Sequence, residues 1–172
     1  MWAFDEHRAG LKPVPRRIRT LKGRRPVATG RSRYEWLHPH GFIRPTSGAV
    51  ESFPCNAVDT ALFAAVLTRS AASVGAGADK TVVLVLDNTG WHGGGGKLAS
   101  PEGLRRVFLP PRSPELQPAE RLWPLTDEVV ANENLASLAE LDRALAERCL
   151  ALTAQPDLIR AHTCFHWQPQ VA

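Results

Sequence analysis

A strand signal runs from Thr81 to Leu86 and ends directly at the pair Asp87-Asn88. Every residue after Thr81 in this run is apolar, whereas a strand with one wet face alternates apolar and polar residues. The run therefore indicates a strand that is buried on both faces, and such a strand needs other layers on each side of its sheet. This predicts a layered α/β fold with Asp87 at the carboxyl end of an interior strand.

The other patterns along the chain fit a mixed sheet flanked by helices. Two β-prone runs are separated by the turn composition of residues 44–48, which predicts a hairpin. A first strand is expected to end at Asp5 and, so close to a terminus, to fray as an edge. The predicted elements are strands at Trp2–Phe4, Tyr34–Ile43, Gly48–Phe53 and Leu104–Leu109, and helices at Val58–Ser73, Ala119–Val130 and Ser137–Leu152.

The length and composition are those of one globular domain. The chain has 172 residues, of which 44% are hydrophobic and 22% charged, which suffices for one core. No apolar run approaches the roughly 20 residues that cross a bilayer, and the amino terminus lacks the order of a signal peptide. We therefore expect a cytoplasmic protein, associated with the nucleoid when it binds DNA, and one domain over residues 1–172.

The net positive charge comes almost entirely from one segment, residues 8–33, called the basic arm here. It holds ten Lys and Arg residues and no acidic residue. Such a block attracts polyanions, of which nucleic acid is the commonest, although it also fits a solvated loop that keeps a protein soluble. Its prolines and glycines favour an irregular conformation. The predicted nucleic-acid contacts are Arg16, Arg17, Arg19, Lys22, Arg24 and Arg25.

Two acidic residues are predicted to lie at the ends of secondary-structure elements, one after a strand and one at the start of a helix. Asp87 comes at the carboxyl end of a strand, where open α/β sheets bind ligands, although Asp-Asn there also makes a turn by bonding its own backbone. Glu120 follows Pro118, the expected first residue of a helix, and so also suits the free N–H groups of that helix end. Gln117 is a poor cap before it, and prolines stiffen the approach.

A third carboxylate, Asp5, joins them if its strand pairs beside Thr81–Leu86. Three carboxylates so close would repel one another unless cations lay among them. Oxygen ligands with room for water suit Mg²⁺ or Mn²⁺, and two such ions about 3.5–4 Å apart can cleave a phosphodiester. A basic arm that binds a polyanion and an acidic centre that cuts it would work together.

The segment from Leu109 to Trp123, together with Asp5-Glu6 and with Leu86-Asp87-Asn88 followed by His92, resembles the catalytic domain of mariner-like DDE transposases and bacterial insertion-sequence relatives. The resemblance runs from Trp2 to about Cys149. It implies a ribonuclease-H-like fold, with helices over 118–154 at the carboxyl end, and Asp5, Asp87 and Glu120 as a triad that binds two Mg²⁺ or Mn²⁺ ions. It also implies DNA hydrolysis and strand transfer in transposition, by a homodimer on paired element ends.

The resemblance further suggests supporting residues around the triad. Asn88 and His92 are expected to contact DNA or to support the metal ligands, and a turn asparagine and a packed histidine are the alternatives. Arg112 and Arg121 are candidate phosphate contacts, and Trp123 is expected in the core.

Family members usually carry a helix-turn-helix region ahead of the catalytic domain, and this chain begins almost at the first catalytic strand. A catalytically inactive, transposon-derived DNA-binding or assembly fragment is therefore an alternative. A ribonuclease that acts on RNA–DNA hybrids is a weaker alternative, because the fold alone would permit it.

Overall fold

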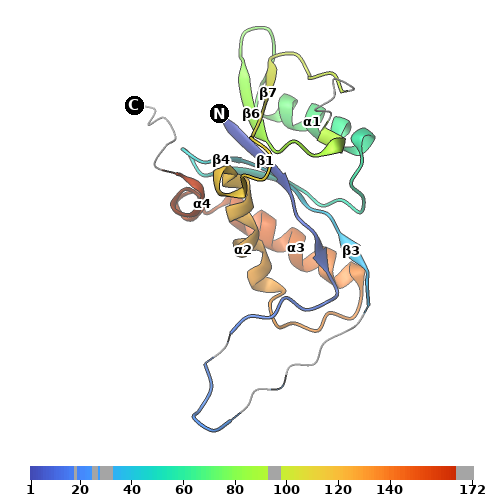
Figure 1. Cartoon of the computed structure of the whole chain (residues 1–172), viewed down its shortest axis with the longest axis vertical. Coiled ribbons are helices and arrows are strands. Elements are labelled where there is room, and N and C mark those ends of the chain that lie inside the picture. Colours follow the sequence, from blue (N-terminus) through green and yellow to red (C-terminus); the bar gives the residue numbers. More distant parts are fainter. Residues whose placement is uncertain (18, 25–26, 28–32, 93–97, 166–172) are drawn as a thin grey trace.

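The computed structural model describes residues 1–17, 19–24, 27, 33–92 and 98–165. Its centre is a mixed sheet with strand order β5-β4-β1-β6-β7 (Figure 1). The antiparallel pairs are β1–β4 and β4–β5, and the parallel pairs are β1–β6 and β6–β7. The strands are β1 (Trp2–Glu6), β4 (His40–Arg44), β5 (Ala49–Phe53), β6 (Val82–Leu86) and β7 (Leu104–Phe108).

The position of β1 corrects the prediction for the first strand. β1 does not end at Asp5 and is not an edge, because it continues to Glu6 and pairs with a strand on each side. Its successive side chains point to opposite faces of the sheet, and both Ala3 and Phe4 are fully buried. Ala3 packs in the cluster on one face and Phe4 in the cluster on the other. Burial on two faces holds this terminal strand in the sheet.

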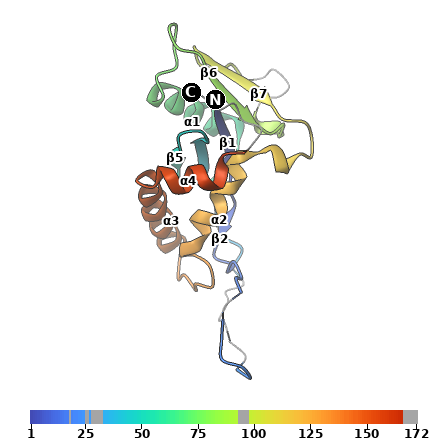
Figure 2. The same ribbon diagram turned by 90° about the vertical axis from the view of Figure 1, so that its left-hand side faces the viewer.

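Helices cover both faces of the sheet (Figures 1 and 2). On one face α1 (Thr60–Ser73) packs Phe63 and Leu67 against Phe4 and Phe42, and Asp59 caps α1 by accepting a hydrogen bond from the Leu62 N–H at 2.8 Å. The other face carries η3 (Pro118–Leu122), α2 (Trp123–Thr126), α3 (Leu138–Thr153) and α4 (Pro156–Thr163). The described helices include none long and apolar enough to cross a membrane.

The predicted helix Ala119–Val130 is a series of short helices instead. The 3-10 helix η3 leads into a single turn of α-helix, α2, and then into η4 (Asp127–Val129). Pro118 opens η3 and Pro124 lies in α2, and a proline ring supplies no N–H for continuous helical bonding. Two further 3-10 turns, η1 (Gly90–His92) and η2 (Pro114–Leu116), follow β6 and β7.

The predicted hairpin is confirmed in β4 and β5, with Gly48 at the turn in a left-handed conformation, φ +72°. The predicted strand Tyr34–Ile43, however, is broken into β3 (Trp36–Leu37) and β4. β3 pairs with β2 (Ala9–Gly10) in a separate two-stranded ribbon. The basic arm leaves this ribbon, and its described residues lead away from the body (Figures 1 and 2).

Candidate functional site

Asp87 follows β6 directly, and its two carboxylate oxygens have different surroundings. Its Oδ1 lies 2.6 Å from Nδ1 of His92 and accepts the Thr89 hydroxyl at 3.1 Å. The same Oδ1 also accepts the Thr89 N–H at 3.4 Å, which is the turn alternative that the sequence left open. Oδ2 accepts no hydrogen bond from the described residues, and the side chain is 42% exposed. Asp87 therefore makes the turn with Oδ1 and leaves Oδ2 without a donor among the described residues.

Asp5 lies in β1 beside the end of β6. The parallel register pairs Ala3 with Val85, so two residues further along the strands Asp5 comes level with Asp87. Its Oδ2 accepts the indole N–H of Trp123 at 2.6 Å, and among the described residues its Oδ1 has no donor. Burial and the nearby carboxylates Glu6, Glu120 and Asp87 raise the pKa of Asp5 to about 7, although the Trp123 hydrogen bond opposes this shift.

Glu120 lies in η3, which the buried side chain of Gln117 ties to β1. The Gln117 amide donates to the Phe4 carbonyl at 2.9 Å, and its oxygen accepts the Ala119 N–H at 3.3 Å. The interpretation of Gln117 as a poor cap is therefore wrong. Glu120 itself is exposed and accepts no hydrogen bond from the described residues, so it does not serve as a cap. Burial first, and then the charges of Asp87 and Glu115, raise the pKa of this carboxyl.

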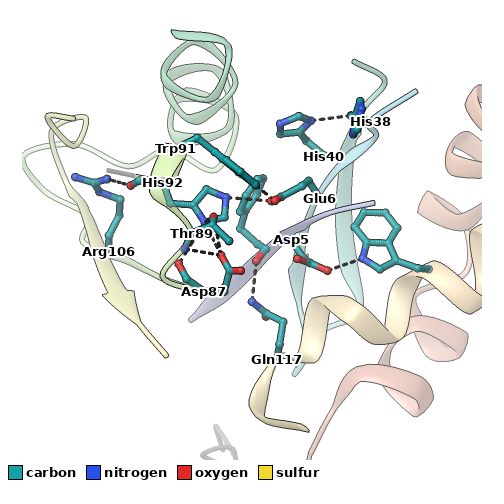
Figure 3. A network of polar contacts seen from close by, with 12 residues as sticks. Asp5, Glu6, His38, His40, Asp87, Thr89, Trp91, His92, Arg106 and Gln117 are labelled. Atoms are coloured by element: carbon teal, nitrogen blue, oxygen red, sulfur yellow. Dashed lines mark hydrogen bonds and ion pairs between the residues drawn. The ribbon is translucent and has the colours of Figure 1, made fainter. Parts of the chain in front are cut away.

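Asp5, Asp87 and Glu120 thus lie at one end of the sheet. Asp87 and Glu120 line an open pocket with Asn88, Thr89 and residues 109–114, and Asp5 lies beside it in β1 (Figure 3). Each of the two aspartates gives one oxygen to a buried ring N–H and keeps the other free. Within the described residues no group of three or more His, Cys, Asp or Glu side chains is close enough to hold a metal ion. The free oxygens nevertheless have the chemistry that suits Mg²⁺ or Mn²⁺.

His92, which the sequence placed near Asp87, is completely buried between two carboxylates. Its Nδ1 faces Asp87, and its Nε2 lies 3.0 Å from Oε2 of Glu6. Since an ionised carboxylate only accepts hydrogen bonds, both ring nitrogens donate and the ring is an imidazolium. Burial alone lowers the pKa of His92, but the hydrogen bonds to Asp87 and Glu6 outweigh it and raise this pKa to about 9. Burial would raise the pKa of Asp87, but the hydrogen bond and positive charge of His92 and the hydrogen bonds from Thr89 together outweigh burial and lower this pKa.

The remaining predicted contacts divide between the pocket and its surroundings. Asn88 and Arg112 are exposed and line the pocket, and Arg112 has a left-handed backbone with φ 60°. Arg121 is exposed too, but its guanidinium lies 5.0 Å from the ring centroid of Phe165. The first two are therefore placed at the pocket, and Arg121 already has an aromatic partner.

The base of the basic arm is fastened to the body. Arg16 donates from its side chain to the Pro124 carbonyl at 2.6 Å and from its backbone N–H to the Asn132 side chain at 2.9 Å. Beyond it Arg17, Arg19, Lys22 and Arg24 are exposed, so the side chains are available to a polyanion. Arg25, also predicted to contact nucleic acid, lies outside the described residues.

Sequence reasoning did not assign roles to Glu6 and Gln117, and it gave Trp123 only a place in the core. Trp123 is indeed 6% exposed, and it packs over Gly41, where a Cβ would lie 2.7 Å from the indole ring. The available signals were that Glu6 directly follows Asp5, and that Gln117 and Trp123 flank Glu120 by three residues. Neither feature of the sequence predicts that Glu6 contacts His92, that Gln117 donates to the Phe4 carbonyl or that Trp123 donates to Asp5.

Comparisons with known proteins identify the family of this chain. A protein-family model described as DDE superfamily endonuclease matches residues 1–142. An uncharacterised protein, y4pE/y4sA, of Sinorhizobium fredii is 38% identical over 88 residues, which are 51% of this chain and 63% of that protein. This chain thus spans less than two thirds of that relative.

Solved structures of Mos1 show the same fold at low sequence identity. The Mos1 strand transfer complex has a TM-score of 0.57 at 12% identity, and the mariner Mos1 paired-end complex with Mg has 0.58 at 15%. Both matches cover 97% of this chain, and they cover 55% and 56% of the Mos1 chains. The predicted ribonuclease-H-like fold is thereby confirmed.

The family model covers the strands and the 3-10 helix that carry Asp5, Asp87 and Glu120, and also the basic arm. The resemblance inferred from the segment between Leu109 and Trp123 therefore holds for most of the chain. The protein belongs to the DDE superfamily endonuclease family.

Proposed function

We propose that this chain is the catalytic domain of a transposase, which hydrolyses a DNA phosphodiester and joins the freed 3′ end to target DNA. The observation that carries the proposal is the meeting of Asp5, Asp87 and Glu120, from β1, the end of β6 and η3, beside one pocket. Membership of a DDE endonuclease family and the likeness of the fold to Mos1 support it.

The residues at the pocket fit the divalent cations that this chemistry needs. Asp5 Oδ1, Asp87 Oδ2 and the Glu120 carboxylate would hold them, and the raised pKa values of Asp5 and Glu120 reflect, besides burial, negative charge that cations would compensate. Two ions held by these carboxylates would supply activation of the attacking water or hydroxyl and charge stabilisation of the leaving oxygen. The Mos1 complexes with Mn and with Mg support this choice of ion.

The protein's own groups would bind and orient the DNA. We propose that Asn88 and Arg112, which line the pocket, contact the strand that is cut. Arg121 is a weaker candidate because it lies against Phe165. The exposed cations of the basic arm would hold a duplex through its phosphates, so binding should weaken with salt. We further propose a homodimer on paired ends, since a Mos1 paired-end complex with a transposon end is among the proteins of similar fold.

The test uses DNA that carries the terminal repeats found beside the gene, with Mn²⁺ or Mg²⁺. We expect nicking at the repeat end and joining to a second duplex, and we expect Asp87→Ala or Glu120→Gln to lower both by at least about a hundredfold. A control variant, Asp157→Asn, changes an exposed carboxylate of α4 and should cleave normally. Cleavage that survives Asp87→Ala would refute the assignment.

The second candidate is a catalytically inactive DNA-binding or assembly fragment of a transposon. The observation that favours it is that the three carboxylates, as described, do not form a ready metal-holding group. Titration calorimetry with Mn²⁺ separates the two candidates. Tight binding that Glu120→Gln abolishes supports the enzyme, and absence of specific Mn²⁺ binding together with normal DNA binding supports the fragment.

A further inference from the structure

Three side chains beside the pocket, Glu6, His92 and Asp87, form a continuous chain of polar contacts. The His92 ring is fully buried, the Glu6 side chain is 13% exposed and Asp87 is 42% exposed. The chain therefore runs from the protein interior out to the pocket (Figure 3). It joins β1, which also carries Asp5, to the turn after β6.

Aromatic side chains pack closely around the His92 ring. It packs against Phe63 with ring centroids 4.7 Å apart and meets Phe4 edge-on at 5.2 Å. Its backbone carbonyl accepts a hydrogen bond from Arg106 in β7 at 2.5 Å. The far end of the chain is fixed as well, because the Trp91 indole donates to Oε1 of Glu6 at 3.1 Å. Glu6 thus uses one oxygen for Trp91 and the other for His92.

This arrangement selects one rotamer of Asp87. His92 and Thr89 both act on Oδ1, which leaves Oδ2 as the oxygen without a donor among the described residues at the pocket. A buried ion pair contributes little net stability, because the desolvation of its charges offsets their attraction. Stability alone is therefore a weak reason for the arrangement, whereas residues behind a metal ligand typically fix its orientation.

We propose that Glu6 and His92 are positioning residues, which hold Asp87 with Oδ2 directed to the cation that the proposed function requires. This inference rests on the proposed function and adds Glu6 to it. The negative charge of Glu6 balances the imidazolium, so that the three side chains together keep one net negative charge beside the pocket. Without Glu6, the positive ring would oppose a cation at Asp87.

The experiment measures Mn²⁺ affinity of the full chain for wild type and the variants Glu6→Gln, Glu51→Gln and Asp87→Asn. Glu51 is the matched control, because it accepts hydrogen bonds from Ser70 and Ser73 in α1, away from the pocket. We expect Glu6→Gln to weaken Mn²⁺ binding about 10- to 100-fold, in the range found for residues behind metal ligands. Glu51→Gln should stay within about twofold of wild type, since it leaves the pocket untouched.

A second measurement covers the case in which Glu6→Gln fails to fold. Mg²⁺ is titrated into wild-type protein labelled with ¹⁵N-histidine, and His92→Gln assigns the ring signals. We expect the His92 Nδ1 resonance to shift on Mg²⁺ binding, because its partner Asp87 takes up the ion. A ring that only stabilises the fold would not respond, and an unchanged resonance in Mg²⁺-saturated protein would overturn the inference.

The results distinguish failure of the positioning role from failure of the proposed function. If Asp87→Asn abolishes Mn²⁺ binding while a folded Glu6→Gln binds as wild type does, only the positioning role fails. If wild type and Asp87→Asn bind Mn²⁺ equally, the proposed metal site fails, and the positioning role fails with it.

Discussion

At the scale of single residues, the site depends on side chains that bridge two segments. Gln117 is 2% exposed and holds η3, with Glu120, onto the strand that carries Asp5. Trp123, directly after η3, also contacts β1 and the residue that follows it. Its indole donates a hydrogen bond to Asp5, and its ring stacks on His7 with centroids 5.1 Å apart. The two bonds set the distance between the first and third carboxylates.

Replacement of Gln117 by leucine should therefore lower the free energy of unfolding. The variant leaves the Phe4 carbonyl buried without its donor, which costs about 1–3 kcal/mol. Urea denaturation followed by circular dichroism measures the difference. Gln155→Leu is the control, since its exposed amide bonds the Ala151 carbonyl one turn away, and it should change stability by less than about 0.5 kcal/mol. Equal effects of the two variants would contradict this role of Gln117.

At the scale of elements, the hairpin β4–β5 pairs with β1 and has its turn at the end of the sheet away from Asp5. Its turn packs against the start of α4, and Gly48 is the residue that permits the contact. The φ of Gly48 is +72°, and a Cβ there would lie 1.8 Å from the Pro156 carbonyl oxygen. The turn conformation and the approach of α4 thus both depend on the missing side chain.

The change Gly48→Ala should destabilise the protein by at least about 1 kcal/mol, since left-handed strain alone costs about 1–3 kcal/mol. The contact with Pro156 adds to this cost. Thermal unfolding would show a lower Tm than wild type. Gly77→Ala is the matched control, because Gly77 has no positive φ and no atom within 4 Å of its built Cβ. A Tm for Gly48→Ala equal to that of the control would contradict the packing of α4 on the turn.

How much of the fold and site could be predicted from the sequence depends on the range of the contacts. Asp87 and Glu120 follow local signals, an apolar strand and a proline-rich approach, and both lie where these signals place them. The central position of β1 follows from pairing with strands about 40 and 80 residues away, which local pattern does not encode. The contact of Glu6 with His92 likewise spans 86 residues.

At the scale of the whole molecule, the fold concentrates the negative charges of Asp5, Glu6, Asp87 and Glu120 at one end of the sheet. The described residues of the basic arm lead away from the body (Figure 1). Burial together with this concentration gives Asp5 a pKa of about 7 against an ordinary value of 3.8. Between these two values the folded state of the metal-free chain binds more protons than the unfolded state, so its stability falls as the pH rises.

We predict that wild-type protein in EDTA loses more stability than Asp5→Asn between about pH 4 and pH 7, the range in which Asp5 is ionised in the unfolded state but still largely protonated in the folded state. Asparagine cannot ionise, so the variant lacks this part of the pH dependence. Urea denaturation at several pH values measures both curves, and Asp157→Asn, which changes an exposed residue, should follow the wild-type curve. Parallel curves for wild type and Asp5→Asn would show that Asp5 is not held buried among like charges.

The proposed chemistry requires that Asp5, Asp87 and Glu120 serve one cation-binding centre. Crystals grown with Mn²⁺ and measured for anomalous scattering test this most directly. We predict two Mn²⁺ peaks about 3.5–4 Å apart, with oxygens of all three carboxylates among the ligands. Peaks located elsewhere, or an ion bound by Asp87 with Asp5 and Glu120 both turned away, would contradict a shared centre.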